Sequence, residues 1–351
     1  MRTVELVSTI EAVAPEEWDA LSGDRPFAAH RWLRLAEAVI TDYRPRYLLV
    51  RRQGRLVAAA MGALEHRLQN PVLDARFGWL VRRSPFFLIS VPLTSTCGLL
   101  VDDSPDPQAE LAELLRAVRA VTRKEGFRFS IIDHLTLRHP AIAAQRNFCQ
   151  LAWLPDVHLD LRWATFDEYL DDLPRKKRHE IKRTQRHSER EGIVVSPLVP
   201  TPEHAPTLDR LVANLVQRHG GTRRFQPDLF GRAAAVLGSD LTLLAAHLDS
   251  RLVGCVSLLR CDDVIDVRWI GRDYERTTGT AVYPALLTAC VRTAIASGAG
   301  RLHFGAAAYA TKKHYGVTLE PRTRLFAARS PAVTWAMGRL GHRFEPPGLP
   351  R

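Results

Sequence analysis

The sequence has 351 residues, of which 46% are hydrophobic and 25% charged, so it is long enough for two domains and has the composition of a soluble globular protein. Its five cysteines are odd in number and lack metal-ligand spacing, which indicates reduced thiols and no metal site. The formal net charge of +11 favours anionic partners, namely nucleotides, nucleic acids, carrier proteins or lipid headgroups. No signal-peptide pattern opens the sequence and no apolar run is long enough to span a bilayer, so we expect a cytoplasmic protein.

The first half of the chain alternates strand and helix patterns. An apolar run at residues 46–61 is divided by Gln53-Gly54, a dipeptide typical of a hairpin turn. An amphipathic helix is predicted at residues 107–126, and a strand at residues 129–132. Shorter elements are expected around these, namely strands at residues 4–6 and within 85–101, and helices at residues 16–21 and 30–39.

The second half repeats this order of patterns. Residues 241–256 predict a hairpin that turns at Asp249-Ser250, and a helix and a strand follow it. In both hairpins the turn is followed by Arg-Leu-Val, at residues 55–57 and 251–253. The pattern favours two copies of one mixed α/β unit, although hairpin, helix and strand recur in other α/β proteins too.

The most charged stretch of the chain lies between the two copies, at residues 173–192. Pro174 near its start and Gly192 at its end are typical of a helix, and Ile181 is nearly its only apolar residue. Its basic side chains include Arg175, Lys176, Lys177, Arg178, Lys182, Arg183 and Arg186. Two interpretations stay open: a solvated helix that bridges two domains, or a basic surface that binds phosphates, a carrier protein or RNA.

The stretch from Asp262 to Gly316 carries the strongest functional pattern. A β-branched run at residues 264–270 predicts a buried strand, and a polar loop with two glycines follows it. Apolar residues then recur at helical spacing over residues 282–297, and a second short strand is predicted at residues 301–305.

The loop in this stretch has the arrangement that binds anions. A glycine-bearing loop at a helix N-terminus points backbone N–H groups outward, and the helix dipole lies behind them. Phosphates would lie on the N–H groups of Thr278, Gly279, Thr280 and Ala281, and Arg276 would add positive charge. An ordinary strand-to-helix turn, with Gly279 present only for close packing, is the alternative.

Four segments carry a resemblance to known families. Arg276 to Ala281 fits the pattern Arg/Gln-x-x-Gly-x-Gly/Ala and resembles the pyrophosphate loop of the GNAT acyltransferase superfamily. The other three resemble the tandem-GNAT group that includes Fem-type peptidoglycan aminoacyltransferases and cellulose-biosynthesis-type acetyltransferases. They are residues 92–98, residues 163–192, and the tail Tyr309-x-x-Lys312-Lys313-x-Tyr315-Gly316.

The resemblance implies a mixed α/β fold of two tandem GNAT-like domains, each a mixed twisted sheet flanked by helices. We expect a degenerate N-terminal domain at residues 1–160, basic linker helices at residues 161–193, and a C-terminal domain at residues 194–351 that carries the acyl-donor site. Only the second copy keeps the glycine loop, so one active site is expected.

GNAT-type chemistry implies roles for four side chains. Direct transfer of an acyl group from a thioester to an amine needs positioning, a base for the ammonium and stabilisation of the oxyanion. The base would be Asp266 or His303, Tyr283 would be the acid for the leaving thiolate, and Lys312 would steady a carbonyl oxygen or a phosphate. The structural alternatives are a pair between Asp266 and Arg268, a His303 packed in the core, and an exposed Lys312.

The resemblance implies an N-acyltransferase that moves an acyl group from acyl-CoA, or from the pantetheine of an acyl carrier protein, to a small-molecule or peptide amine. The chain lacks the coiled-coil arm of some Fem enzymes, and its loop looks more like a pantetheine-cofactor loop than theirs does. A Fem-like transferase that uses aminoacyl-tRNA is the second expectation, and a non-catalytic GNAT-fold binding protein is the third. The acyl group and the acceptor stay open.

Overall fold

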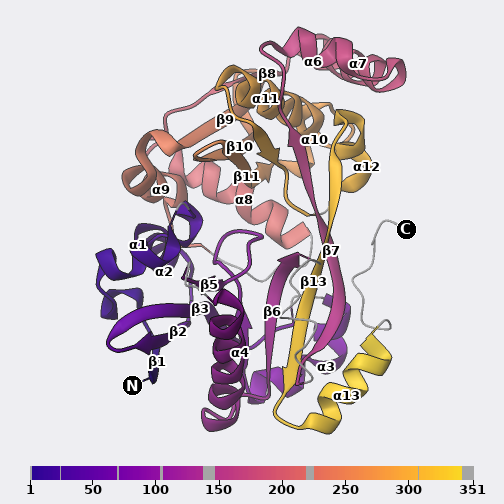
Figure 1. Cartoon of the computed structure of the whole chain (residues 1–351). Coiled ribbons are helices and arrows are strands. Elements are labelled where there is room, and N and C mark those ends of the chain that lie inside the picture. The colour runs from indigo at the N-terminus through magenta and orange to yellow at the C-terminus, as the bar shows by residue number, and fades with distance from the viewer. Residues whose placement is uncertain are drawn as a thin grey trace. The chain divides into compact units, whose positions relative to one another are not determined.

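The chain forms two compact units, residues 1–155 with 321–351 and residues 156–320 (Figure 1). The computed structural model describes residues 2–23, 25–68, 71–102, 106–136, 147–218, 225–306 and 308–341. These limits differ from the expected domains: the basic helices belong to the second unit, and the segment from Pro321 belongs to the first. The reason for the second difference is strand pairing, because residues 322–328 pair antiparallel with residues 129–136 of the first unit.

The first unit is built on a mixed sheet. Its strands are β1 (Arg2–Val7), β2 (Pro45–Arg52), β3 (Arg55–Glu65), β4 (Phe86–Ile89), β5 (Leu99–Val101), β6 (Phe129–Thr136) and the parts of β7 (Cys149–Asp160) and β13 (Thr318–Ala328) that belong to it. The order is β1-β2-β3-β4-β6-β13, with β5 on β3, and β4 with β6 is a parallel pair. Its helices are α1 (Pro15–Ser22), α2 (His30–Val39), α3 (Pro71–Arg83), α4 (Pro107–Lys124) and α13 (Pro331–Leu340), with short turns η1 (Ile10–Ala12) and η2 (Pro26–Ala28).

Alternation along the strands divides the core of the first unit between two faces of the sheet. Phe87 and Ile89 of β4 pack with the apolar side of α4, while Phe86 and Leu88 pack with Phe326 on the opposite face. This is the period of two that a strand imposes on its side chains. The second face has a cavity, described below.

The second unit has a six-stranded sheet in the order β7-β12-β11-β10-β9-β8. Its other strands are β8 (Val194–Pro197), β9 (Leu241–Leu248), β10 (Arg251–Cys261), β11 (Val264–Arg272) and β12 (Arg301–His303). Its helices are α6 (Phe166–Asp172), α7 (Arg175–Arg190), α8 (Ala205–Arg218), α9 (Leu229–Leu237), α10 (Tyr274–Thr277), α11 (Val282–Ala296) and α12 (Tyr309–Lys312), with η3 (Gly238–Asp240) and η4 (Lys313–Tyr315).

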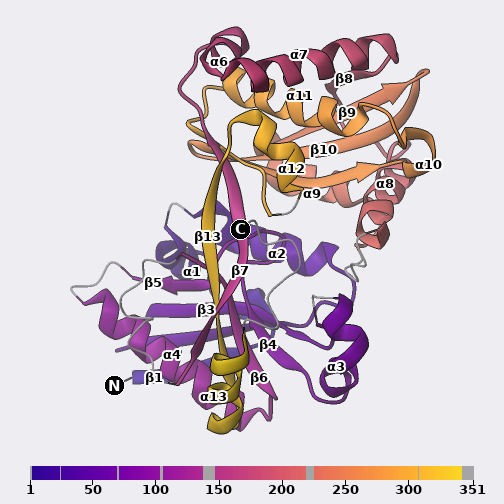
Figure 2. The same ribbon diagram turned by 90° about the vertical axis from the view of Figure 1, so that its right-hand side faces the viewer.

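Helices cover both faces of this sheet. Within the second unit, Figure 2 shows α11 on one face, with α6 and α7 stacked on α11, and α8 and α9 on the other face. The apolar side of α11 includes Leu286, Val291 and Ile295, which are buried against Val256 and Leu258 of β10. The described helices include none that is long and apolar enough to cross a membrane.

The local patterns in the sequence predicted these elements well. Both hairpins turn where expected, and the central residues of each turn lie in the left-handed region: φ is 51° and 86° at Gln53 and Gly54, and 49° and 61° at Asp249 and Ser250. Such a turn matches the twist of the strands it joins. The basic helix, the amphipathic helix α4 and the helix α11 are confirmed within two residues at each end.

The two units share one arrangement, which confirms the expected mixed α/β fold and its repeat. In each, a helix leads into a strand that pairs in parallel with an earlier strand over three residues. The pairs are 87–89 with 130–132 in the first unit and 264–266 with 301–303 in the second.

Gly271→Ala should lower the free energy of unfolding by about 1–3 kcal/mol, the usual cost of overpacking. An added Cβ would lie 2.7–2.8 Å from backbone and Cβ atoms of Leu211 and the backbone nitrogen of Val212, so α8 would have to move off β11. Urea unfolding measures the loss. Gly254→Ala on β10 is the control, because its Cβ would meet only side-chain atoms at 3.0 Å or more, and an equal loss in both variants would contradict the prediction.

Candidate active site

The parallel pair of β11 and β12 ends at the two predicted base candidates. Asp266 is the register partner of His303, and β12 stops there while β11 continues for six more residues. Beyond this point β11 is also irregular, since Trp269 has a φ of 36° and the register with β10 shifts between Cys255 and Ser257. The edge of β11 after Asp266 is therefore left without β12 as a partner.

Asp266 is buried and takes part in an ion pair. Its side chain is 4% exposed, and Arg268 donates a hydrogen bond of 3.0 Å to Oδ2, so the pairing considered as its structural alternative is present. Its Oδ1 is buried and has no hydrogen-bond partner among the described residues. Burial raises the pKa of this carboxyl, while the Arg268 guanidinium lowers it by a smaller amount.

His303 is more accessible than Asp266 and faces a carboxylate. Its side chain is 24% exposed, and Nδ1 lies 3.8 Å from Oδ2 of the buried Asp156. Its Nε2 is buried without a hydrogen-bond partner in the part of the chain that the structure describes. The ring therefore lies between a buried carboxylate and a nitrogen that the described residues leave unengaged.

Two members of this cluster, Asp156 and His158 of β7, were not predicted from the sequence. His158 is the register partner of His303, and the two rings lie 5.9 Å apart. His158 is buried, and burial lowers its pKa. The signal was present as Asp156-x-His158-x-Asp160, whose spacing of two places the three side chains on one side of a strand.

Lys312 is buried and holds a turn. Its Nζ donates to the carbonyl oxygens of Phe304, Gly305 and Ala306 at 2.8, 2.9 and 3.4 Å, which occupies all three N–H donors. Burial lowers its pKa to about 8, and the carboxylates of Asp156 and Asp266 oppose that effect. Lys312 is therefore placed to position His303 through the turn after β12, and the exposed lysine of the alternative interpretation is not observed.

In the predicted anion loop, several hydroxyl and N–H groups already donate hydrogen bonds within the chain. Gly279 has a φ of 81°, and a Cβ added to it would meet no atom within 4 Å. The hydroxyls of Thr278 and Thr280 donate to the carbonyl oxygens of Tyr274 and Thr277, so they stiffen the loop. The N–H of Thr280 also donates to the carbonyl oxygen of Thr277.

A carboxylate of the chain itself occupies the helix N-terminus. The Ala281 N–H donates to Oε2 of Glu191 at 2.8 Å, and Oε1 of Glu191 lies 3.2 Å from Nε2 of His187. Glu191 follows directly after α7, so the basic helix ends at the loop where a phosphate was expected. This contact was not predicted, because ninety residues separate its partners.

Arg276 and Tyr283 lie near the loop, at its two ends. Arg276 is 55% exposed and lies 3.8 Å from Asp273, which caps α10 by accepting a hydrogen bond from the Arg276 N–H. Tyr283 is half-buried in the first turn of α11, and burial raises its pKa to about 12. Tyr274 raises that pKa and Arg272 lowers it, each by less than burial does, so both side chains lie near Tyr283.

Tyr315, from the family-like tail, fixes the position of α11. Its hydroxyl donates to the carbonyl oxygen of Pro284 at 2.8 Å and lies 3.0 Å from Oγ1 of Thr288. The Tyr169 hydroxyl donates in turn to the carbonyl oxygen of Tyr315 at 3.0 Å. The tail and α6 therefore anchor the start of the helix that follows the loop.

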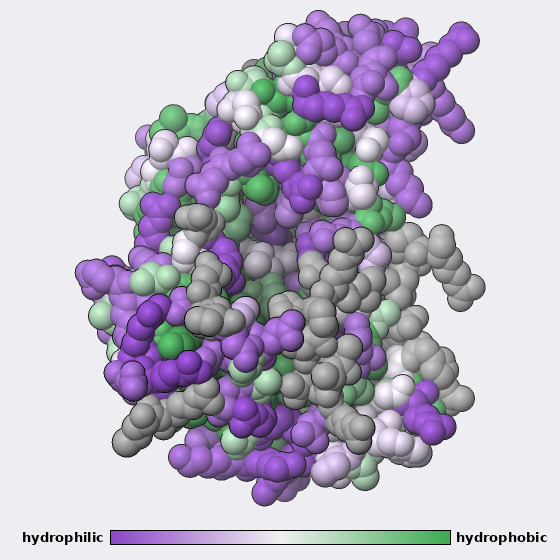
Figure 3. Space-filling view, viewed as in Figure 1, coloured by the Kyte–Doolittle hydropathy of each residue, from purple (hydrophilic) through white to green (hydrophobic). Residues whose placement is uncertain are grey.

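The helix α7 is fixed on α11 by one side and exposes cations on the other. Ile181 and Ser188 are its buried residues, and Figure 3 shows a hydrophilic surface over α6 and α7. Arg178 pairs with Asp171, and Arg183 with Glu180. Further exposed cations are Arg175, Lys176, Lys182, Arg186 and Arg190.

Comparison with protein families gives one match over most of the chain. Residues 9–315 match the FemAB-like family, described as peptidoglycan biosynthesis/recognition. A curated relative, a putative 8-amino-7-oxononanoate synthase 2 of Mycobacterium tuberculosis, is 28% identical over 203 residues, which are 55% of this chain and 26% of the relative. The chain thus spans about a quarter of the length of the curated relatives it matches.

Two solved structures show the same fold. The crystal structure of FemX has a TM-score of 0.59 and 14% identity, with 94% of this chain and 99% of FemX covered. A tandem GNAT protein from the clavulanic acid biosynthesis pathway has a TM-score of 0.51 and 15% identity, with 94% and 99% covered. Both cover the two units, which confirms the tandem GNAT-like fold, and the family match over residues 9–315 confirms the Fem-type group.

Lys312→Met should lower the free energy of unfolding by about 2 kcal/mol near pH 7, because three carbonyl oxygens lose a charged donor. The pKa of Lys312 is about 8 in the folded protein against 10.5 unfolded, so the unfolded state binds more protons between these values. Stability of the parent protein from this group therefore rises from about pH 8 towards pH 10.5, and the variant lacks that rise.

Urea unfolding from pH 7 to pH 9.5 measures the difference, which should grow with pH. Lys313→Met, at the exposed neighbouring lysine, is the control and should change little. Parallel pH profiles for Lys312→Met and the parent protein would contradict the assignment.

Proposed function

The chain belongs to the FemAB-like family, and from this premise and the site geometry we propose that its second unit transfers an acyl group from an activated donor to an amine. Family and fold support an acyltransferase or aminoacyltransferase in general. The observation that carries the proposal is the end of the β11–β12 pair at Asp266 and His303. Beyond this point β11 continues without β12, beside two titratable side chains, each with a buried atom that lacks a partner among the described residues.

His303 is the proposed base. Its ring is partly exposed and its Nε2 is unengaged by the described residues, whereas Arg268 already engages one oxygen of Asp266. A substrate ammonium would give a proton to Nε2, and the carboxylate of Asp156 would stabilise the imidazolium. Asp266 and Lys312 then serve as positioning residues, since one shares the register of His303 and the other holds the turn that follows it.

The bond changes follow from this assignment. The neutral amine attacks the carbonyl carbon of the donor, a C–N bond forms, and the bond from carbon to sulfur or ester oxygen breaks. Tyr283 would give its proton to the leaving atom and regain one from the attacking nitrogen. A phenol is protonated at neutral pH, as an acid requires, and burial raises the pKa of Tyr283 to about 12, which makes it a weaker proton donor.

For the donor we favour a pantetheine thioester, of CoA or of a carrier protein. An extended arm would lie along β11 beyond the end of β12, and the phosphates of CoA would contact Arg276 and Gly279. A phosphate on the Ala281 N–H would have to displace the Glu191 carboxylate. A charge-assisted hydrogen bond contributes about 1.5–3 kcal/mol, so displacing Glu191 would lower the affinity for CoA without abolishing binding.

The Glu191 contact gives specific support to a second candidate, an aminoacyl-tRNA donor with an amine on a peptide or peptidoglycan precursor as acceptor. A donor without a diphosphate at this position has no conflict with Glu191. The exposed cations of α7 then offer a surface for the phosphates of an RNA. A carrier protein would use the same cations for its carboxylates.

His303→Gln should lower turnover about 10²–10⁴-fold with the donor dissociation constant unchanged, because general-base catalysis is lost while the ring's shape is kept in part. Thiol release from acyl-CoA, or amide formation from aminoacyl-tRNA, over a panel of amines measures turnover. His314→Gln, at an exposed histidine of η4, is the control. Undiminished turnover in His303→Gln would contradict the assignment of His303 as the base.

Glu191→Gln should tighten binding of acetyl-CoA about tenfold, since a phosphate then replaces a neutral amide instead of a carboxylate. Calorimetry measures the affinity, and Glu189→Gln, exposed at the same end of α7, is the control. No heat with any acyl-CoA in either protein would remove CoA as donor.

Salt-sensitive tRNA binding would favour the second candidate. The slope of the logarithm of the binding constant against the logarithm of the salt concentration should then fall in magnitude by about two to three in Lys176→Ser/Lys182→Ser/Arg186→Ser.

A further inference from the structure

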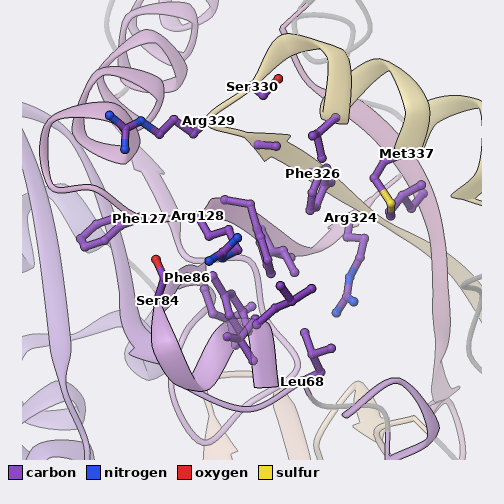
Figure 4. A pocket seen from close by; sticks show the side chains of 18 of the residues that line it. Leu68, Ser84, Phe86, Phe127, Arg128, Arg324, Phe326, Arg329, Ser330 and Met337 are labelled. Carbon is purple, nitrogen blue, oxygen red and sulfur yellow. The ribbon is translucent and has the colours of Figure 1, made fainter. Parts of the chain in front are cut away.

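The first unit has a cavity of about 630 Å³ on the face of its sheet opposite α4. Its walls come from β4, β6, β7 and β13, and from α3 and α13 (Figure 4). This volume lies within the roughly 300–1,000 Å³ of small-molecule sites. The proposed reaction in the second unit does not use it.

The lining is mainly apolar. Phe86, Leu88, Ile131 and Phe326 project from successive strands, and Met337 of α13 closes one side. Among the described residues that line the cavity there is no aspartate or glutamate. An apolar space of this size without an acid suits an aliphatic chain better than a polar ligand.

One arginine of the lining is already neutralised. Arg324 donates two hydrogen bonds to the buried Asp133, at 2.6 and 2.7 Å, and its guanidinium lies 3.2 Å from the ring centre of Trp153. A flat charged group held between a carboxylate and an aromatic ring forms a rigid wall. It offers little net charge to a ligand.

A second arginine of the lining supplies positive charge at the rim. Arg128 is exposed and precedes Phe129 of β6, and Figure 4 shows it next to the apolar side chains. Its neighbour Arg329, whose N–H donates to the carbonyl oxygen of Arg128 at 3.1 Å, points its side chain away from them. Arg128 is therefore the cation that can attract an anion to the rim.

We propose that this cavity binds the aliphatic chain of a long-chain carboxylate, such as a free fatty acid, with its carboxylate on Arg128. The apolar lining selects the chain, and the Arg128 guanidinium selects the charge of its head. The first unit would then be a ligand-binding module with a site of its own.

A chain-length series tests the proposal on the unmodified protein. Each buried methylene should tighten binding roughly fourfold, so dodecanoate should bind about 10²-fold tighter than octanoate. Dodecanol should bind at least about tenfold more weakly than dodecanoate, because a neutral head cannot pair with the Arg128 guanidinium. Calorimetry with monomeric ligands measures all three, and equal affinities for octanoate and dodecanoate would overturn the proposal.

Two variants locate the ligand. Met337→Trp should fill the cavity and abolish dodecanoate binding, while Arg339→Trp on the same helix, outside the lining, should leave it intact. Arg128→Gln should weaken dodecanoate at least about tenfold and leave dodecanol unchanged, and Arg329→Gln, at the neighbouring exposed arginine, is the control and should change neither. Dodecanoate binding of parental strength in a folded Met337→Trp protein would also overturn the proposal, and the chain-length series decides alone if that variant does not fold.

Discussion

A buried ammonium fixes the place where β11 and β12 part. When the chain leaves the sheet after His303, three successive carbonyl oxygens lose the possibility of ladder hydrogen bonds, and Lys312 supplies donors to all of them. Gly305 permits the turn, with a φ of 67°. The position of His303 therefore depends on a charged group that burial alone would disfavour.

The loop before α11 is explained by the same need for buried polar groups to find partners. A helix N-terminus attracts negative charge, and in this chain Glu191 supplies that charge from the end of α7. The basic helix is consequently an integral part of the second unit, fixed by Ile181 within the core and by Glu191 at its end. The charged stretch is a largely solvated helix, as the first interpretation expected, but it packs within the second unit and does not bridge two domains. Binding of an anionic partner to it stays a prediction.

Local patterns were enough to predict most elements, because turns, caps and periodicity are encoded by neighbours in sequence. Gln53-Gly54, Asp249-Ser250 and Gly298 each mark an observed turn or helix end. The partners of the site were harder to predict, since they come from distant strands. The alignment of His158 with His303 depends on the register of β7 with β12, and no local pattern contains that register. For the same reason the burial of Lys312 was missed: its solvent exposure depends on what packs around α12.

The first unit is assembled from both parts of the chain that flank the second, and this affects the order of folding during synthesis. Residues 156–320 are continuous and can fold once they have left the ribosome. The first unit lacks β13 until residues 321–328 are made. The edge of β6 that pairs with β13 therefore has no partner strand from β13 while the whole second unit is synthesised. The half of the molecule that is translated first is thus the half that is completed last.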